Sequence, residues 1–126
     1  MLVLDSGGFG RLAERSRRTL ALIEEFRRAG LWPPVVPTMV LVESLQGHPG
    51  RDADANRFLK TIAKDDIVSL EVARRAAELR RRARRGSAVD ALVVALAEPN
   101  GSVLTGDEAD LSALAAVSYG VAVELV

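Results

Sequence analysis

The chain has 126 residues, 48% of them apolar, and its 17 basic and 17 acidic side chains balance to zero net charge. This length and composition fit one folded domain and argue against a disordered tail. The absence of cysteine excludes disulfides, thiol catalysis and cysteine metal sites. Apolar runs are too short to span a membrane, and no basic leader precedes the first strand, so we expect a cytoplasmic protein.

The first quarter of the chain predicts strand, helix and strand. The segment Met1–Asp5 is four apolar residues followed by an acid, which is typical of a strand buried on both faces. Gly7 and Gly8 then allow a tight exit and a close approach of backbone. The spacing of apolar residues predicts a helix over Phe9–Arg28, and a β-branched run predicts a second strand over Trp32–Val36.

The middle of the chain is mainly helical by the same criteria. We expect helices over Met39–Leu45 and Asp52–Ile62, separated by the His48-Pro49-Gly50 break. The single histidine is therefore expected in an exposed loop. A brief strand is expected at Ile67–Val68, and a long Ala- and Arg-rich helix over Leu70–Arg84.

The last third of the chain alternates again between helix and strand. Ser87 caps an apolar helix that runs to Glu98. A strand over Ser102–Thr105, a helix over Asp107–Ala115 and a strand over Val121–Val126 follow. This alternation predicts one three-layer α/β domain, residues 1–126, with a largely parallel sheet.

Four isolated acids follow strands or interrupt apolar helices: Asp5, Glu43, Asp90 and Asp107. In a parallel α/β sheet the carboxyl ends of the strands and the starts of the following helices share one edge, so we expect these acids there. Each acid also has a structural alternative. Asp5 and Asp107 can be helix N-caps, Asp90 a capping-box partner of Ser87, and Glu43 part of an exposed stripe.

Four carboxylates in one crevice repel one another, and a divalent cation would relieve that repulsion. Ligand sets made only of oxygen suit Mg²⁺ or Mn²⁺ rather than Zn²⁺. Such sites hydrolyse phosphodiesters by activating water, a reaction that needs no protein nucleophile. This chemistry agrees with a chain that has no cysteine and one histidine.

Four segments, in order along the chain, resemble the PIN-domain ribonucleases, and within them the VapC-type toxins of prokaryotic toxin–antitoxin pairs: VLDSG (3–7), VLVES (40–44), SAVDALVVALA (87–97) and VLTGDEADL (103–111). The resemblance implies a three-layer α/β/α PIN-like domain with a mostly parallel sheet of four to five strands. It also implies an endoribonuclease that depends on Mg²⁺ or Mn²⁺ and acts on RNA. A cognate antitoxin protein and a homodimer are the implied partners.

The same resemblance assigns site residues. The implied catalytic and metal-binding acids are Asp5, Glu43, Asp90 and Asp107. Asp110 takes or shares the role of Asp107 as a metal ligand, and Ser6 and Thr105 support the acids. The chain departs from the family after the first acid, because Gly7-Gly8 stands where the family has Ala or an aliphatic residue.

Arginines near the acidic edge are the candidate RNA contacts: Arg11, Arg15, Arg81, Arg82 and Arg85. For those in the Arg-rich helix, a solvated helix face is the alternative. Two other functions stay open. A receiver-like signalling domain also has an acidic pocket, but it needs an acidic pair after the first strand and a late lysine, whereas the only lysines here are Lys60 and Lys64. A catalytically silent PIN-like scaffold would bind a protein without cleaving RNA.

Overall fold

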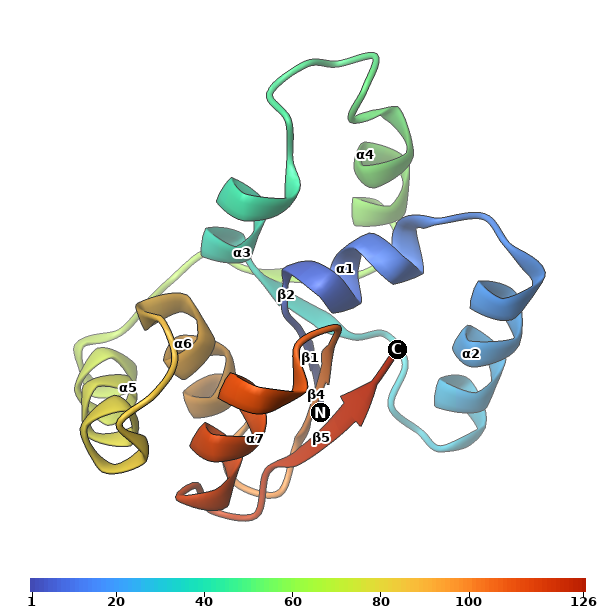
Figure 1. Ribbon diagram of the computed structural model, residues 1–126. Coiled ribbons are helices and arrows are strands. Elements are labelled where there is room, and N and C mark those ends of the chain that lie inside the picture. Colours follow the sequence, from blue (N-terminus) through green and yellow to red (C-terminus); the bar gives the residue numbers. More distant parts are fainter.

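The computed structural model describes residues 1–126 as five strands and seven helices (Figure 1). The strands are β1 (Leu2–Leu4), β2 (Val35–Pro37), β3 (Ala63–Asp65), β4 (Ser102–Thr105) and β5 (Ala122–Leu125). The helices are α1 (Ser6–Ala13), α2 (Arg17–Arg28), α3 (Thr38–Ser44), α4 (Ala53–Leu59), α5 (Leu70–Ala83), α6 (Ala88–Ala97) and α7 (Glu108–Ala116). No helix combines the length and apolarity that crossing a membrane requires.

All five strands are parallel and follow the order β3-β2-β1-β4-β5. Helices α1 and α2 connect β1 to β2, α3 and α4 connect β2 to β3, α5 and α6 cross from β3 to β4, and α7 connects β4 to β5. Helix α1 contacts α2, α3 and α4, whereas α5, α6 and α7 contact one another (Figure 1). The predicted three-layer α/β/α architecture with a parallel sheet is thus confirmed.

The strand order bears on the receiver-like alternative. Receiver and flavodoxin-like sheets have the order 2-1-3-4-5, with the chain reversing direction between strands 1 and 3. Here the reversal lies between β1 and β4, so the topology is a different one. The receiver-like interpretation is therefore wrong for this chain.

Two predicted elements differ from the observed ones. The single helix expected over Phe9–Arg28 is two helices, because the Ser16 hydroxyl accepts the Thr19 N–H at 3.1 Å and starts α2 afresh. The strand expected at Ile67–Val68 lies earlier, at β3. There the Asp65 carboxylate accepts the N–H of Ile67 at 3.1 Å, which turns the chain out of the sheet and leaves Ile67 exposed.

The first turn of α1 packs directly on the end of β4. A Cβ added to Gly8 would lie 2.2 Å from the carbonyl oxygen of Leu104, and one added to Gly7 would lie 2.8 Å from the backbone nitrogen of Gly106. Only glycine allows this approach, as the sequence indicated.

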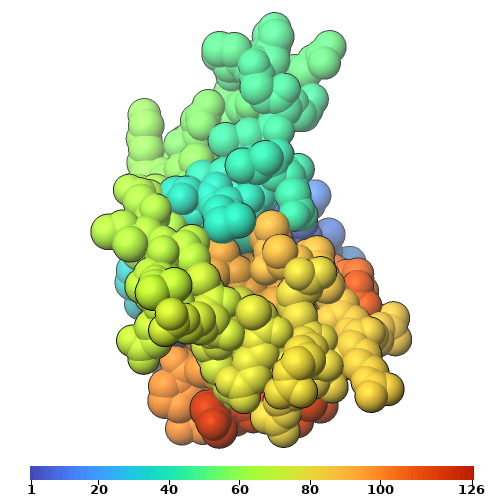
Figure 2. Space-filling model, turned by 90° about the vertical axis from the view of Figure 1, so that its left-hand side faces the viewer, coloured from blue at the N-terminus to red at the C-terminus, as the bar shows by residue number.

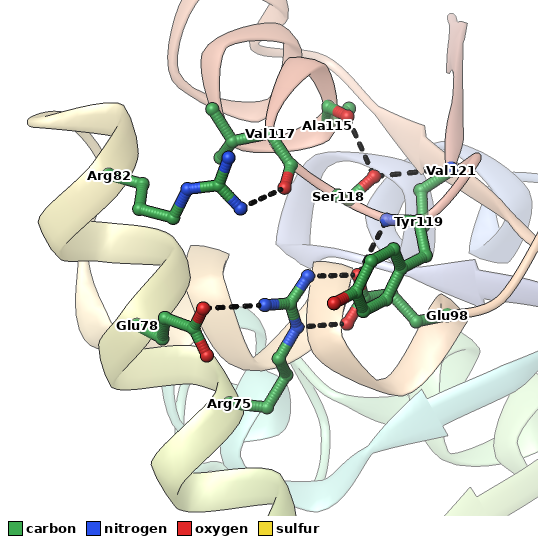
Figure 3. Close-up of polar contacts among 9 residues, drawn as sticks. All are labelled: Arg75, Glu78, Arg82, Glu98, Ala115, Val117, Ser118, Tyr119 and Val121. Carbon is green, nitrogen blue, oxygen red and sulfur yellow. Dashed lines mark hydrogen bonds and ion pairs between the residues drawn. The ribbon is translucent and has the colours of Figure 1, made fainter.

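The Arg-rich helix α5 is bound to the rest of the domain by its arginines (Figure 3). The guanidinium of Arg75 makes two hydrogen bonds to the Glu98 carboxylate, at 2.7 and 2.8 Å, and lies 4.3 Å from the Tyr119 ring centroid. Glu98 also accepts the N–H of Tyr119 at 2.7 Å. This half-buried network ties α5 to the end of α6 and to the segment before β5, so part of the arginine face is neither solvated nor free for RNA.

We predict opposite effects for two alanine substitutions in α1. Gly8→Ala should lower the free energy of unfolding by roughly 1–3 kcal/mol, because its Cβ meets rigid β4 backbone. Gly10→Ala is the matched control, since nothing lies within 4 Å of its added Cβ. It should raise the free energy of unfolding by about 0.5–1 kcal/mol through helix propensity. Urea denaturation measures both, and equal effects would contradict the close packing of Gly8 on β4.

Candidate functional site

Asp5 lies at the point where the strand order reverses, between the carboxyl ends of β1 and β4. It is the N-cap of α1 and is only 6% exposed. Its Oδ1 accepts the N–H of Gly8 at 2.7 Å, and its Oδ2 accepts a hydrogen bond from the Thr105 hydroxyl. Ligands of open parallel α/β sheets bind in the crevice at such a switch point. A buried carboxylate there is the main chemical feature of this edge.

The electrostatic surroundings of Asp5 disfavour its charged form. Burial raises the pKa of the Asp5 carboxyl above its ordinary value, and the hydrogen bonds from Gly8 and Thr105 lower it in part. The negative charge of Asp90 raises this pKa further. The charge of Asp90, 85 positions further along the chain, therefore acts on the Asp5 carboxyl.

Asp90 has two structural contacts of its own at the start of α6. Its backbone N–H donates to the Ser87 hydroxyl at 3.0 Å, and its Oδ2 accepts the N–H of Ser87 at 3.0 Å. This is a complete capping box, so the structural alternative for Asp90 holds geometrically. The two roles are compatible, because a carboxylate has a second oxygen and further lone pairs for other ligands.

Glu43 and Asp107 do not join Asp5 and Asp90 in a closed cluster. Glu43 lies in the last turn of α3 and is exposed, and Asp107 is the exposed N-cap of α7, whose carboxylate accepts the Ala109 N–H at 3.2 Å. No group of three acidic or histidine side chains is arranged to hold a metal ion. The structure therefore does not show the expected convergence of four acids, and the metal-ligand roles stay predictions.

The two residues predicted to support the acids lie at the same edge. Thr105 is fully buried at the end of β4; its hydroxyl donates to Asp5 and accepts the N–H of Asp107 at 2.8 Å. It therefore links the side chain of the first acid to the backbone of the fourth. Ser6, the first residue of α1, is half-buried beside Asp5 in the chain.

The candidate RNA contacts differ in whether their guanidinium groups are already bound to other groups of the chain. Arg85 donates from Nε to Asp110 Oδ1 at 3.0 Å, so the proposed alternative acid and one proposed RNA contact are paired with each other. Arg82 donates to the carbonyl of Val117 at 3.4 Å (Figure 3), and Arg11 lies 3.7 Å from Glu14. Arg15 and Arg81 are exposed and make no ion pair.

Sequence reasoning missed the role of Asp52. Its carboxylate is 6% exposed and accepts three backbone N–H groups, from Gln46 at 2.8 Å, Gly47 at 2.9 Å and His48 at 3.2 Å. These hydrogen bonds lower the pKa of Asp52. They shape the loop between α3 and α4, in which His48 is exposed as expected. An acid that ends a Gly-Pro loop before a helix was the available signal.

The chemistry of the donor set suits Mg²⁺ or Mn²⁺, because the candidate side chains offer carboxylate and hydroxyl oxygens. Burial is the main cause of the raised pKa of Asp5, and a cation would offset both this cost and the repulsion from Asp90. Asp5 and Asp90 would hold such an ion, and Glu43 or Asp107 would complete its ligands. The residues therefore fit a divalent metal by the chemistry of their donor atoms.

Comparisons with known proteins support the fold alone. No family model and no curated protein sequence matches the chain. Among solved structures, a chain of VapBC2 from Rickettsia felis, crystallised bound to a DNA fragment from its promoter, superposes with a TM-score of 0.70. The match covers 99% of this chain and 98% of that chain at 12% sequence identity. This chain therefore has a PIN-like fold of the kind that the resemblance implied.

We predict that Asp90→Asn stabilises the metal-free protein at pH 7 by a few tenths to about 1 kcal/mol. The change removes a negative charge beside Asp5, whereas asparagine can still accept the Ser87 N–H. A raised pKa means that the folded state binds the Asp5 proton more tightly than the unfolded state does. This group's contribution to stability therefore falls as pH rises through its titration, and the variant should show a shallower fall.

The measurement is urea denaturation of both proteins between pH 4 and pH 7 in the presence of EDTA. Glu108→Gln, which removes one exposed acid from the first turn of α7, serves as the control for general charge removal. If Asp90→Asn destabilises the metal-free protein and leaves RNA cleavage intact, capping is the sole role of Asp90.

Proposed function

We propose that this chain is a metal-dependent endoribonuclease of the VapC type, restrained by an antitoxin protein. The observation that carries the proposal is the buried Asp5 carboxylate, held beside Asp90 at the switch point of a PIN-like sheet. Burying a charge is costly, so a fold keeps such a pair where the charge does chemical work. The oxygen-only donors, and a sequence without cysteine, favour phosphodiester hydrolysis over nucleophilic catalysis by the protein.

In this proposal Asp5, Glu43, Asp90 and Asp107 hold Mg²⁺ or Mn²⁺. The bound ion lowers the pKa of a water molecule and offsets charge on the phosphate that is attacked. The chain's own groups fix the carboxylates: the Gly8 N–H and the Thr105 hydroxyl orient Asp5, and Ser87 orients Asp90. The fixed orientation spares reorganisation during the reaction.

RNA binding needs positive charge around an acidic edge. Arg15 and Arg81 are exposed and unpaired, and Arg11 and Arg82 make only long or exposed contacts. These four are the arginines that we propose for phosphate contacts. Because the proposed substrate is RNA, we propose that the protein acts in the cytoplasm.

The partner that we propose is an antitoxin protein, as the VapBC2 neighbour is a complex of that kind. A groove of about 450 Å³ between α2 and α4 suits such a partner. Its apolar lining includes Leu20, Ile23, Trp32 and Phe58, and Leu20 is 65% exposed. An extended or helical peptide with apolar anchors would cover these side chains.

A second apolar surface suits another copy of this chain. Met39 of α3 and Val68, before α5, are both exposed and line one hollow. The hollow has a volume of about 210 Å³, and the rest of its lining is mainly small apolar residues of α5 and α6. Figure 2 shows this face, with α3 in teal above the yellow-green start of α5. Projecting side chains and a hollow on one face are what a two-fold interface needs.

The decisive experiment measures RNA cleavage. With Mg²⁺ or Mn²⁺ the chain should cleave single-stranded RNA, EDTA should stop cleavage, and Asp5→Asn should lower kcat at least 100-fold. Glu124→Gln, an exposed acid on the edge strand β5, is the control and should keep full activity. A folded chain that binds a protein partner tightly but cleaves no RNA would support the silent-scaffold alternative.

The same variants extend the experiment to cells. Expression of the chain should arrest growth, expression of Asp5→Asn should not, and co-expression of the product of a neighbouring antitoxin gene should restore growth. Normal growth at confirmed soluble levels of the unaltered chain would contradict the toxin proposal.

A separate prediction tests the homodimer. Met39→Asp combined with Val68→Asp should convert a dimer to a monomer, because both residues line the hollow and each charge would be buried in the interface. Light scattering after size exclusion measures the mass. Leu20→Asp is the control, since Leu20 is exposed on the α2 groove and not on this face. A dimer mass that the variant leaves unchanged would place the dimer contact elsewhere. A monomer mass for the unaltered chain would contradict the homodimer.

A further inference from the structure

The connection from α5 to α6, residues 84–87, is fixed at several points. Arg84 ends α5 in the left-handed conformation with φ 55°, and Gly86 has φ 91°. A Cβ added to Gly86 would lie 2.6 Å from Cδ1 of Leu114 in α7. The Gly86 carbonyl accepts a hydrogen bond from Arg80 at 3.3 Å. The connection therefore packs on α7 and has one well-defined path.

The Arg85–Asp110 ion pair is a second attachment of this connection to α7. Arg85 Nε lies 3.0 Å from Asp110 Oδ1, and these residues are 25 positions apart in the sequence. Asp110 belongs to the first turn of α7, where the helix dipole also favours a negative charge. The pair joins the approach to α6 with the helix that follows β4. Both elements lead to the acidic edge.

The next residues connect the restrained segment to Asp90. Ser87 follows directly after Gly86 and forms the capping box with Asp90 through two hydrogen bonds of 3.0 Å. One of them is made by the Asp90 carboxylate itself, through Oδ2. A shift of residues 85–87 would therefore move or rotate that carboxylate, whereas Asp5 would keep its own contacts with Gly8 and Thr105.

We propose that Arg85 and Asp110 are positioning residues, whose ion pair holds the Asp90 carboxylate in place for the reaction. The inference rests on the proposed nuclease function and adds an ion pair that positions one of its acids. It also gives Asp110 a role other than metal ligation. In this role Asp110 acts only through Arg85, and neither residue touches the substrate or a metal ion.

The ion pair is exposed, with side-chain exposed fractions of 56% for Arg85 and 33% for Asp110. Exposed pairs add little to global stability. Catalytic geometry is more sensitive, because a small misplacement of one carboxylate slows a reaction that depends on orientation. The proposal thus predicts a local effect on Asp90 and on kcat with almost no change in melting temperature.

The test uses Arg85→Gln, Asp110→Asn, the double variant and the swapped pair Arg85→Asp/Asp110→Arg. Hydrogen exchange reports on the backbone amides of Ser87 and Asp90, which donate the two capping-box bonds. Exchange of both amides should be about five- to ten-fold faster in either single variant, with the melting temperature within about 2 °C of the unaltered chain. The double variant should be no faster than the worse single variant, because one interaction is lost in all three.

RNA cleavage supplies the second readout. Each single variant should lose about ten-fold in kcat with KM within two-fold, the effects should not add, and the swapped pair should recover to within about three-fold of the unaltered chain. Glu24→Gln and Arg28→Gln are the matched controls, since they break an exposed arginine–carboxylate pair far from α6. They should leave exchange at Ser87 and Asp90 unchanged.

Three results would overturn the inference. Unchanged exchange in both single variants would show that the pair does not restrain Asp90. Additive losses in kcat would show that the residues act separately. A swapped pair as inactive as Asp110→Asn, together with a smaller metal-induced rise in melting temperature for Asp110→Asn alone, would make Asp110 a metal ligand. If the unaltered chain cleaves no RNA, the proposed function fails while the exchange experiment still decides the coupling.

Discussion

The contact between the first turn of α1 and the end of β4 is the constraint on which the acidic edge depends. Gly8 leaves no space for a side chain against the Leu104 carbonyl. This contact lets the helix start directly after β1 and turn its first N–H groups toward Asp5. The N–H of Gly8 and the hydroxyl of Thr105 then bind the two oxygens of one carboxylate. The same contacts therefore bury the Asp5 carboxylate and fix its orientation, at the only reversal in the strand order.

A carboxylate buried in this way is a cost to the fold unless something offsets its charge. Two hydrogen bonds offset part of the cost, but burial and the charge of Asp90 still raise the pKa of Asp5. A fold selected for stability alone would place an asparagine or an apolar residue there. In the proposed function these acids are kept because their charge is needed for the chemistry at this edge.

Sequence patterns predicted what depends on local periodicity. The buried run before Asp5, the capped helix after Ser87 and the strand ending at Thr105 all appear within a few residues of their expected bounds. Patterns failed where one polar side chain redirected the chain, as at Ser16 and Asp65. The effect of the Asp90 charge on Asp5 followed from topology. The positions of Glu43 and Asp107 did not, because the exposure of a side chain depends on packing that periodicity does not describe.

The long-range ion pairs gave no signal in the sequence, and they change the interpretation of the Arg-rich helix. Arg75 of α5 binds Glu98, and Arg85, just past the end of α5, binds Asp110. Two arginines of this segment therefore fasten it to other elements, so the segment is not one uniform basic surface. An arginine committed to a carboxylate in this way is neutralised and has little attraction for phosphate. Ten of the fifteen arginines make no ion pair, so in the proposed function RNA affinity should depend on those of them that lie closest to the acidic edge.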